Sequence, residues 1–293
     1  MRIVVLGLSL SSSWGNGHAT TWRALLRAMA GRGHEILFLE REQPWYAAHR
    51  DLTEPDFCEL ALYDQLADLD RFAARIRDAD AVIVGSFVPE GAEAIRAIAP
   101  RARGLLAFYD IDTPVTMRKL DSGEHAYISP ELVPLFDLYL SFTGGPTLRR
   151  LERQYGARMA RALYCAVDAQ TYRATGGKLR WALGYLGTYS EDRQPLVQRL
   201  LIDAARLRPG ERFVVAGPQY PDSIEWPANV DRIEHLPPAQ HAQFYSSLRW
   251  ALNVTRADMI RAGWSPSVRI FEAAACGAPI ISDAWDGIET FLR

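Results

Sequence analysis

Four polar segments of this 293-residue chain carry residue types that could do chemistry, and the first surrounds a histidine. The segment SLSSSWGNGHAT (residues 9–20) places Gly15, Asn16 and Gly17 directly before His18. A helix is expected to begin there, so its N–H groups could bind an anion or a sugar hydroxyl, and a neutral imidazole could act as a general base. A capping loop with a solvent-exposed histidine is the simpler alternative. The spacing matches neither G-x-G-x-x-G nor a P-loop, which disfavours nicotinamide cofactors and simple ATPase chemistry.

The second segment is GTYSEDR (residues 187–193), which ends in Arg193. Its small residues allow a ligand to approach the backbone, and a guanidinium can bind a diphosphate through two parallel hydrogen bonds. The alternative is a surface loop in which Arg193 pairs with Glu191 or Asp192. The residue types leave both interpretations open.

The third segment is GWSPSVRIFEAAACG (residues 263–277), and its S-P-S start predicts the beginning of a helix. The N–H groups around Ser267 and Val268 would then face a bound phosphate. Arg269 and Glu272 are three residues apart and share one helix face. They either form a salt bridge, or Glu272 binds the two hydroxyls of a ribose.

The fourth segment is FYDIDTPV (residues 108–115), in which Asp110 and Asp112 form a D-x-D pattern. That pattern holds a divalent metal and a nucleotide diphosphate in some enzymes of another architecture, but alone it is a weak signal. Asp112 precedes Thr113 and Pro114, which is typical of a helix N-cap followed by a first-turn proline. We therefore interpret Asp112 as a cap and keep Asp110, at the end of an expected strand, as a candidate catalytic group.

The elements that position these segments are predicted by the hydrophobic pattern. Strands are expected at residues 2–8, 34–39, 79–85, 104–109, 138–142 and 162–167, and helices at 19–30, 64–77, 90–98 and 146–155. A second series has strands at 181–189, 213–216, 251–254 and 279–282 and helices at 195–207, 239–248 and 267–276. Such alternation predicts an α/β protein with two doubly wound, Rossmann-like domains.

A polar stretch at residues 168–180 separates the two series and contains Gly176-Gly177, as a linker would. We place the boundary near residue 170, which gives domains 1–170 and 171–293. In open α/β sheets, ligands bind beyond the carboxyl ends of the strands, and two domains facing each other would form a cleft there.

Composition restricts the partners and the compartment. Lys+Arg 33 against Asp+Glu 35 gives a net charge of -2, so a nucleic-acid partner is not expected. The three cysteines, Cys58, Cys165 and Cys276, form no CxxC pair, which argues against a disulfide framework or a zinc site. No stretch has the length of a transmembrane span or the pattern of a signal peptide, so a cytoplasmic protein is expected.

The whole chain resembles glycosyltransferases of the GT-B type, most closely the spore-maturation (CgeB-like) branch. The resemblance depends on GNGHATTWRALLRAMAGRGHEILFLE (residues 15–40), YCAVDAQTY (164–172), LGYLGTYSEDRQP (183–195), FVVAGPQYP (213–221) and RAGWSPSVRIFEAAACGAPIISDAWDGIE (261–289). The last segment is the most specific, because it matches over nearly thirty residues.

The resemblance implies metal-independent transfer of a sugar from a nucleotide-diphosphate donor, most simply a UDP-sugar, to a hydroxyl acceptor, with no further cofactor. The acceptor could be a polysaccharide, a protein or a small metabolite. The resemblance assigns the first domain to the acceptor and the second to the donor. It gives His18 the role of acceptor base beside the loop of Gly15, Asn16 and Gly17. It places the donor at Gly187, Thr188, Tyr189, Arg193, His235, Leu236, Ser267, Val268, Arg269 and Glu272, with Glu272 on the ribose, Arg193 on the diphosphate, and the base near His235 and Leu236.

Two features depart from this family. Many retaining members have a second glutamate eight residues before the one matching Glu272, where this chain has Trp264. The chain ends at Arg293, where the family usually continues with further helices, one of which crosses back to the first domain, so the C-terminal part is expected to be short. These departures keep open a non-catalytic nucleotide-sugar binding protein with the same cleft. A two-lobed solute sensor would share the architecture, but it usually has an export signal.

Overall fold

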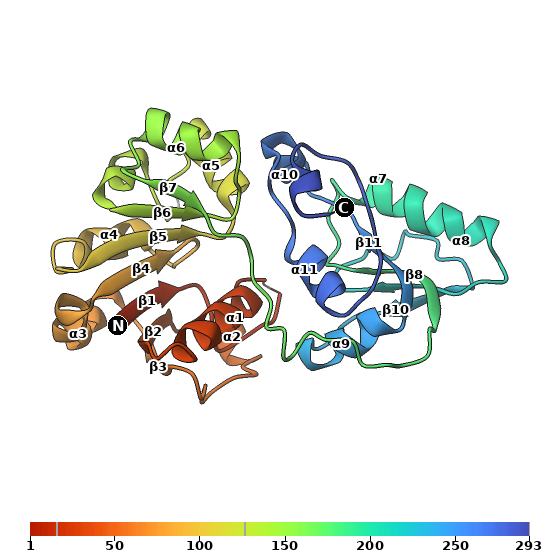
Figure 1. Cartoon of the computed structure of the whole chain (residues 1–293), viewed down its shortest axis with the longest axis horizontal. Helices are drawn as coiled ribbons and strands as arrows, with labels where there is room; N and C mark the ends of the chain where they lie inside the picture. Colours follow the sequence, from red (N-terminus) through yellow and green to blue (C-terminus); the bar gives the residue numbers. More distant parts are fainter. Residues whose placement is uncertain (16, 126, 293) are drawn as a thin grey trace. The chain divides into compact units, whose positions relative to one another are not determined.

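The computed structural model describes residues 1–15, 17–125 and 127–292, and the chain forms two compact units (Figure 1). The first unit contains Met1–Ala166 together with two short later segments, Ala262–Ser265 and residues 289–292. The second unit contains Val167–Arg261 and Pro266–Ile288. The two units are described separately below.

The first unit is built on a sheet of parallel strands in the order β3-β2-β1-β4-β5-β6-β7. The strands are β1 (Arg2–Gly7), β2 (Glu35–Arg41), β3 (Glu59–Tyr63), β4 (Ala81–Gly85), β5 (Leu105–Asp110), β6 (Leu138–Ser141) and β7 (Ala160–Ala162). Helices connect them: α1 (His18–Ala30), α2 (Pro44–Ala47), α3 (Ala73–Asp78), α4 (Gly91–Ile98), α5 (Thr113–Ser122) and α6 (Pro146–Tyr155), with 3-10 turns at Leu66–Phe72 and Pro130–Leu135.

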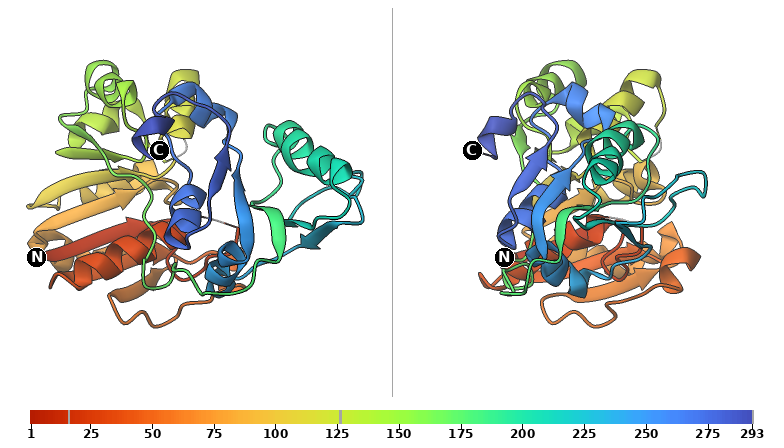
Figure 2. Two further views of the ribbon diagram at one scale, coloured as in Figure 1. Left: turned by 45° about the vertical axis from the view of Figure 1, so that its right-hand side comes forward. Right: turned by 90° about the vertical axis from the view of Figure 1, so that its right-hand side faces the viewer.

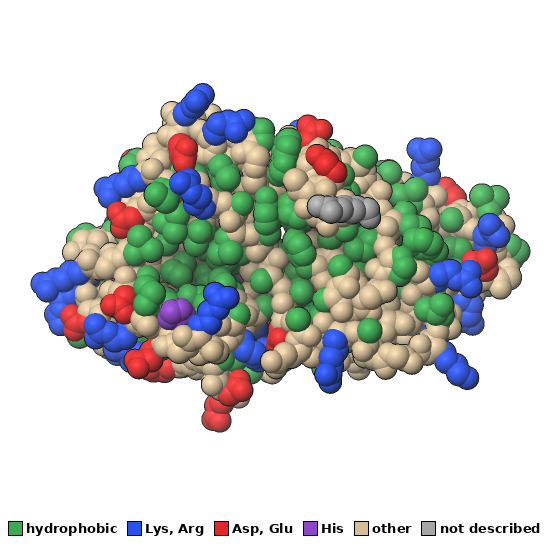
Figure 3. Space-filling view, viewed as in Figure 1, with side chains coloured by type: hydrophobic (Ala, Val, Ile, Leu, Met, Phe, Trp, Pro, Cys, Tyr) green, Lys and Arg blue, Asp and Glu red, His purple; other side chains and the backbone are tan. Residues whose placement is uncertain are grey.

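Both faces of this sheet are apolar, as expected for parallel strands covered by helices. Side chains alternate between the faces along a strand, so Val4 and Leu6 belong to one core, which includes residues of α3 and α4. Ile3 and Val5 belong to the other core, which is closed by Trp22 of α1. On that second face a groove lies beside α1, and Figure 3 shows apolar side chains gathered over the first unit.

The second unit has a parallel sheet in the order β10-β9-β8-β11-β12. The strands are β8 (Trp181–Leu186), β9 (Phe213–Ala216), β10 (Val230–Ile233), β11 (Leu248–Asn253) and β12 (Ile280–Ser282). The helices are α7 (Gln194–Val197), α8 (Asp203–Leu207), α9 (Pro238–Ser246), α10 (Ala257–Ala262) and α11 (Val268–Ala275), and a 3-10 turn spans Ile288–Thr290. The α7–α8 run packs on one face of the sheet, whereas α9 and α11 pack on the other (Figure 2).

The predicted fold class, an α/β protein with parallel sheets, is confirmed, and most predicted elements form within a few residues of their expected bounds. Three details were wrong. The helix expected at 64–77 is a 3-10 turn at Leu66–Phe72 followed by the short α3, and the helix expected at 195–207 contains a π-helical stretch, Gln198–Ile202, between α7 and α8. The strand expected at 162–167 forms earlier, as β7, and overlaps the expected range at one residue. Strands β3 and β10 and helices α2 and α10 were missed. Both missed strands are at sheet edges, where an apolar run is not required, and β10 reads VDRI.

None of the described helices combines the length and the apolar character needed to cross a lipid bilayer.

Candidate functional site

The loop after β1 is held from inside the protein by Glu40, the next-to-last residue of β2. The Glu40 carboxylate is 1% exposed and accepts hydrogen bonds from the N–H groups of Leu10 (2.6 Å) and Ser11 (2.9 Å). It also accepts from the hydroxyls of Ser9 (3.1 Å) and Ser11 (2.7 Å). This part of the loop therefore already binds an anion, which is supplied by the chain itself. Glu40 was not predicted as a functional residue, although a carboxylate near the end of an otherwise apolar strand was a usable signal.

His18 is the first residue of α1, as predicted, and it is only 6% exposed, so the solvent-exposed alternative was wrong. Its Nε2 lies 2.6 Å from Oδ2 of Asp112. A carboxylate accepts hydrogen bonds, so this contact places the ring proton on Nε2. Nδ1 is buried with no hydrogen-bond partner among the described residues. The ring therefore keeps one unused lone pair, which is what a general base requires.

Asp112 occupies the N-cap position of α5, but its side chain makes no capping hydrogen bond. The cap interpretation is therefore wrong for the side chain, because the carboxylate is turned to His18. The hydrogen bond between the Asp112 carboxylate and the imidazole is short, as charge-assisted bonds are. The pairing of His18 with Asp112, 94 residues apart in the chain, could not be predicted from spacing.

Asp110 lies behind this pair and is fully buried. Its carboxylate accepts hydrogen bonds from the hydroxyls of Tyr139 (2.6 Å) and Thr116 (2.8 Å) and from the N–H of Asp112 (3.2 Å). Burial raises the pKa of Asp110 to about 6, even though the hydrogen bonds from Tyr139 and Thr116 act in the opposite direction. These contacts suit a residue that orders the turn at Asp112 rather than one that touches a substrate.

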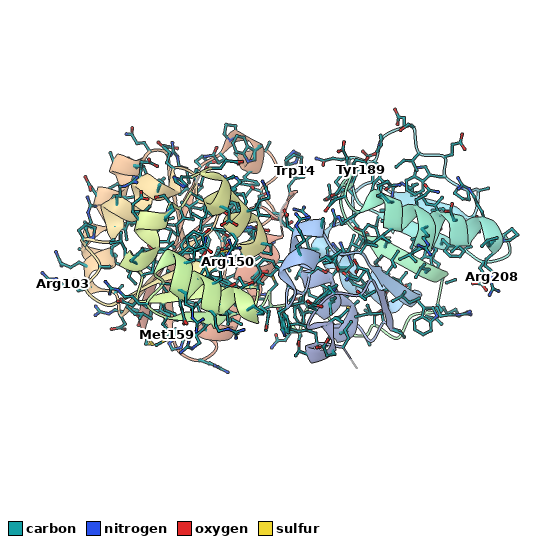
Figure 4. The ribbon with its side chains drawn as sticks, turned by 90° about the horizontal axis from the view of Figure 1, so that it is seen from above. Trp14, Arg103, Arg150, Met159, Tyr189 and Arg208 are labelled. Atoms are coloured by element: carbon teal, nitrogen blue, oxygen red, sulfur yellow. The ribbon has the colours of Figure 1, made fainter. Side chains whose placement is uncertain are left out.

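The rest of the acceptor-side loop is only partly described, because Asn16 lies outside the described residues. Gly15 has a φ of +67° with open space around it, and Gly17 is the N-cap residue of α1. The neighbouring Trp14 is 42% exposed and stacks on the ring of His49 at 4.6 Å (Figure 4).

In the second unit, two buried guanidinium groups lie at the carboxyl end of β8. Arg193 is 7% exposed and donates to the carbonyl oxygen of Thr188 (2.7 Å), while its Nε has no partner among the described residues. Arg269, 8% exposed, donates to the carbonyl of Leu186 (2.6 Å) and to Oδ1 of Asn253 (3.0 Å). All these acceptors are neutral. Burial lowers the pKa of Arg193, and the charge of Arg269 adds to this effect.

The structure overturns the salt-bridge alternatives for these two arginines. Asp192 accepts hydrogen bonds from the Ser190 hydroxyl and from the N–H of Ala257, and the guanidinium of Arg193 turns to the Thr188 carbonyl instead. Arg269 packs its guanidinium over the ring of Tyr185 at 4.7 Å. Arg193 is thus buried against neutral groups, a costly arrangement unless an anion completes it. Burial also opposes the charge of Arg269, but Tyr185, Tyr245 and the nearby Glu272 raise the pKa of this guanidinium.

The segment Gly187–Tyr189 passes directly beside these guanidiniums. A Cβ atom on Gly187 would lie 2.7 Å from the Tyr185 hydroxyl and 2.8 Å from Nη2 of Arg269. The Gly187 carbonyl accepts from the hydroxyl of Tyr220 (3.1 Å), and the ring of Tyr189 stands edge-on to the ring of Tyr220 (Figure 4). A side chain at 187 would therefore have to displace the Tyr185 hydroxyl and the Arg269 guanidinium.

Glu272 projects from α11 and is 5% exposed. Its Oε2 accepts from the Tyr245 hydroxyl (2.8 Å), and its Oε1 lies 3.9 Å from Nδ1 of His241. Burial alone would raise the pKa of Glu272, but His241, Tyr245 and Arg269 together hold it below its usual range. Glu272 is therefore a buried carboxylate that stays ionised.

The predicted helix start also forms, with Ser267 as the N-cap residue of α11 and Val268 as its first residue. The Ser267 side chain does not cap the helix. Its hydroxyl donates to Oδ1 of Asn253 (2.8 Å), the same oxygen that receives Arg269. His235 is exposed, and the carbonyl of Leu236 faces Nε2 of His241 at 3.1 Å. Sequence analysis missed His241, Tyr245 and Asn253, although His241 and Tyr245 are four residues apart on an expected helix.

Trp264 belongs to the first unit and has a φ of +43°, which is strained for a residue with a large side chain. Its ring packs against Gly145, where an added Cβ atom would lie 2.5 Å from the ring, and its own Cβ would lie 3.6 Å from a Cβ added at Gly144. Its carbonyl accepts from the N–H of Gly144 (2.9 Å), and the next hydroxyl, Ser265, bonds Thr143 (2.8 Å). Trp264 thus has a packing role.

No group of three or more His, Cys, Asp or Glu side chains within the described part of the chain is arranged to hold a metal ion.

The chain is similar to known proteins in part of its sequence and in its fold. Residues 193–293 match the profile of a family described as glycosyl transferase-like. No curated protein sequence matches the chain. Among solved structures, an alpha-glucosyltransferase in complex with UDP-glucose and DNA containing an abasic site has a TM-score of 0.68 at 13% identity, over 96% of this chain and 79% of that one.

Two further structures are similar. Sucrose-phosphate synthase from Thermosynechococcus elongatus gives a TM-score of 0.66 at 12% identity, over 99% of this chain and 82% of that one. The catalytic domain of starch synthase IV from Arabidopsis thaliana, bound to ADP and acarbose, gives 0.67 at 10% identity, over 99% and 84%. At these identities the likeness shows the fold, with its two parallel sheets, which this chain shares with the three structures.

Proposed function

We propose that this protein is a glycosyltransferase that moves a sugar from a nucleotide-diphosphate donor, with a UDP-sugar as the first candidate, to a hydroxyl of an acceptor. The observation that carries the proposal is the pair of buried guanidiniums, Arg193 and Arg269, whose hydrogen bonds go to neutral groups, beside the ionised Glu272. The match of residues 193–293 to a glycosyl transferase-like family supports it. The acceptor class, whether polysaccharide, protein or small metabolite, is not specified by these residues.

The donor diphosphate fits between the two arginines. Negative charge grows on the leaving diphosphate in the transition state, and guanidiniums already fixed by Thr188, Leu186 and Asn253 stabilise it without reorganising. The N–H groups at the start of α11, around Ser267 and Val268, add further donors. In this mechanism two arginines and a helix start take the part that a metal ion plays in other transferases.

The second unit would also bind the nucleoside, through Glu272 and through the backbone of His235 and Leu236. An ionised carboxylate accepts hydrogen bonds from two neighbouring hydroxyls, so Glu272 suits the ribose. The base would then lie against the backbone of His235 and Leu236. The backbone of Gly187, Thr188 and Tyr189 would approach the phosphates, because no Cβ atom stands in the way at 187.

His18 would be the acceptor base. Asp112 fixes the proton on Nε2 and stabilises the imidazolium, so Nδ1 is the nitrogen that would take the proton of the acceptor hydroxyl once that buried atom is uncovered. The acceptor oxygen attacks the anomeric carbon as the bond from that carbon to the diphosphate oxygen breaks. The electron pair of the broken bond leaves with the nucleoside diphosphate. Asp110 would support Asp112 from behind.

We assign the acceptor side to domain 1–170 and the donor side to domain 171–293, within the spore-maturation (CgeB-like) branch. The sequence segments quoted above support this finer placement.

Trp264 favours one alternative, a nucleotide-sugar binding protein without transfer activity, because it removes a carboxylate that retaining relatives use. Donor hydrolysis separates the two functions. Slow release of nucleoside diphosphate from a UDP-sugar by the wild type, lost in His18→Ala, indicates an enzyme. Tight binding without any release indicates a binding protein.

The proposal is tested by a thermal-shift screen of the protein against UDP, GDP, ADP, CMP and TDP and their sugar conjugates. A ligand at 100 times its Kd adds about 2.7 kcal/mol of stability. Stabilisation by one nucleoside diphosphate, reduced in Arg193→Ala, supports the donor site. A flat response to every ligand contradicts it.

A further inference from the structure

We propose that His241 is a positioning residue of the donor site, which holds the Glu272 carboxylate in the orientation that receives two ribose hydroxyls. The site would then select ribonucleoside diphosphates over those that lack these hydroxyls. This inference rests on the proposed function, because it assumes that the second unit binds a nucleoside diphosphate.

The position of the imidazole is fixed by its Nε2 atom. His241 lies on α9, its side chain is 13% exposed, and Nε2 is 3.1 Å from the carbonyl oxygen of Leu236. A carbonyl oxygen carries no proton, so Nε2 must donate. The hydrogen bond ties the ring to the segment immediately before α9 and sets the direction in which Nδ1 points.

The opposite edge of the ring faces Glu272. Nδ1 lies 3.9 Å from Oε1 of Glu272 and 3.0 Å from the hydroxyl of Tyr172. Glu272 is the acidic residue paired with His241, and Arg269 interacts with the same carboxylate through its charge. The other carboxylate oxygen, Oε2, is held by the Tyr245 hydroxyl at 2.8 Å. One oxygen of Glu272 is thus fixed by the Tyr245 hydroxyl. The other is attracted at 3.9 Å by the imidazolium form of His241, in which both Nδ1 and Nε2 carry a proton.

Aromatic rings prevent His241 from turning away. Tyr172 and Tyr245 both stand edge-on to the imidazole, with ring centroids at 5.9 and 6.5 Å. A carboxylate fixed in this way presents its remaining lone pairs in one direction and loses little rotamer freedom when a ligand binds. Two adjacent hydroxyls gain most from such a carboxylate, because both hydrogen bonds depend on one orientation.

The test compares binding of UDP with binding of 2′,3′-dideoxy-UDP by calorimetry, or the matching adenosine or guanosine pair if the base screen selects one of those. We expect His241→Ala to weaken the ribonucleotide about 10- to 30-fold and the dideoxy analogue less than 3-fold, because only the former uses Glu272. A residue that merely supports the fold would weaken both ligands alike.

Two conservative substitutions of His241 distinguish the role of Nδ1 from the role of Nε2. The amide nitrogen of Asn lies close to the position of Nδ1, so His241→Asn should recover most of the ribonucleotide affinity. The amide of Gln reaches the position of Nε2, so His241→Gln keeps the bond to Leu236 but should behave like His241→Ala. Gln240→Ala, an exposed change on the same helix, is the matched control and should leave both affinities unchanged.

The outcomes are distinct. Equal loss for both ligands, wild-type affinity in His241→Ala, or rescue by Gln instead of Asn overturns the role of His241 while the donor site stands. If the wild type binds no nucleoside diphosphate, the proposed function fails and this inference fails with it.

Discussion

The two candidate sites differ in how far their buried charges are compensated by neighbouring groups. In the first unit, Glu40 is surrounded by hydrogen-bond donors from its own chain and His18 is paired with Asp112. In the second unit, the hydrogen bonds of Arg193 and Arg269 go to neutral oxygens, and Glu272 offsets the charge of Arg269 but not that of Arg193. A site whose charges are already compensated is suited to holding geometry and moving a proton. A site with excess buried charge is suited to binding an ion of opposite sign. The predictions below test this contrast.

The largest expected effect is the loss of kcat when the proposed general base, His18, is removed. His18→Ala should lower kcat about 1,000-fold, because a positioned general base contributes roughly 100- to 10,000-fold. Affinity for the nucleoside diphosphate should not change, since His18 belongs to the first unit and the donor groups belong to the second. Steady-state kinetics and calorimetry on the same preparations measure both quantities. A variant with full transfer activity would remove His18 from the mechanism.

The next effect concerns the stability of the loop after β1. Glu40→Ala leaves the N–H groups of Leu10 and Ser11 without their acceptor and should lower the free energy of unfolding by about 3 kcal/mol. Glu40→Gln should cost only about 1 kcal/mol, because one oxygen can still accept from the two N–H groups and the amide can donate to the two serine hydroxyls. Urea denaturation compares the pair. Similar losses for both variants would mean that the negative charge itself stabilises the loop.

The central strands and several site residues could be predicted from the sequence, whereas the edge strands and the partners of the site residues could not. Periodicity predicted the central strands because a strand covered on both faces must be apolar throughout, as in β1 and β4. It missed β3 and β10 at the sheet edges, where this constraint is absent. For the site, residue types identified His18, Arg193, Arg269 and Glu272 as candidates but gave their partners incorrectly. The pairing of His18 with Asp112 depends on which strands become neighbours, and local spacing contains no such information.

The pH dependence of the free energy of unfolding tests the role of Asp110 in the first unit. Its pKa is raised to about 6 in the folded protein by burial, against 3.8 as the ordinary value, so between these values the folded state binds more protons than the unfolded state. Stability should therefore fall as pH rises through this window. Relative to Asp110→Asn, the wild type should lose roughly 2 to 3 kcal/mol between pH 4 and pH 6. Denaturation of both proteins at a series of pH values measures the difference.

Asp51 provides a control of opposite sign. Burial opposes the shift, but hydrogen bonds from Arg23 and Ser13 lower the pKa of Asp51 below 3.8. Its contribution to stability is therefore present above that value and is lost as pH falls below it. Asp51→Asn should reverse the trend seen with Asp110→Asn. If both variants shift in the same direction, the pH dependence has another source.

The smallest effect tests the excess charge of the donor site directly. Arg193→Ala should weaken a nucleoside diphosphate about 30-fold, equivalent to about 2 kcal/mol, because it removes a hydrogen-bonded charge from the diphosphate. The same variant should bind the corresponding nucleoside as well as the wild type does, since Glu272 is untouched. The protein without ligand should become no less stable, because a buried guanidinium without an ionic partner is costly. Calorimetry with UDP and uridine, together with denaturation without ligand, separates these effects. If Arg193→Ala destabilises the unliganded protein strongly, its charge is compensated within the fold and the contrast between the two units does not hold.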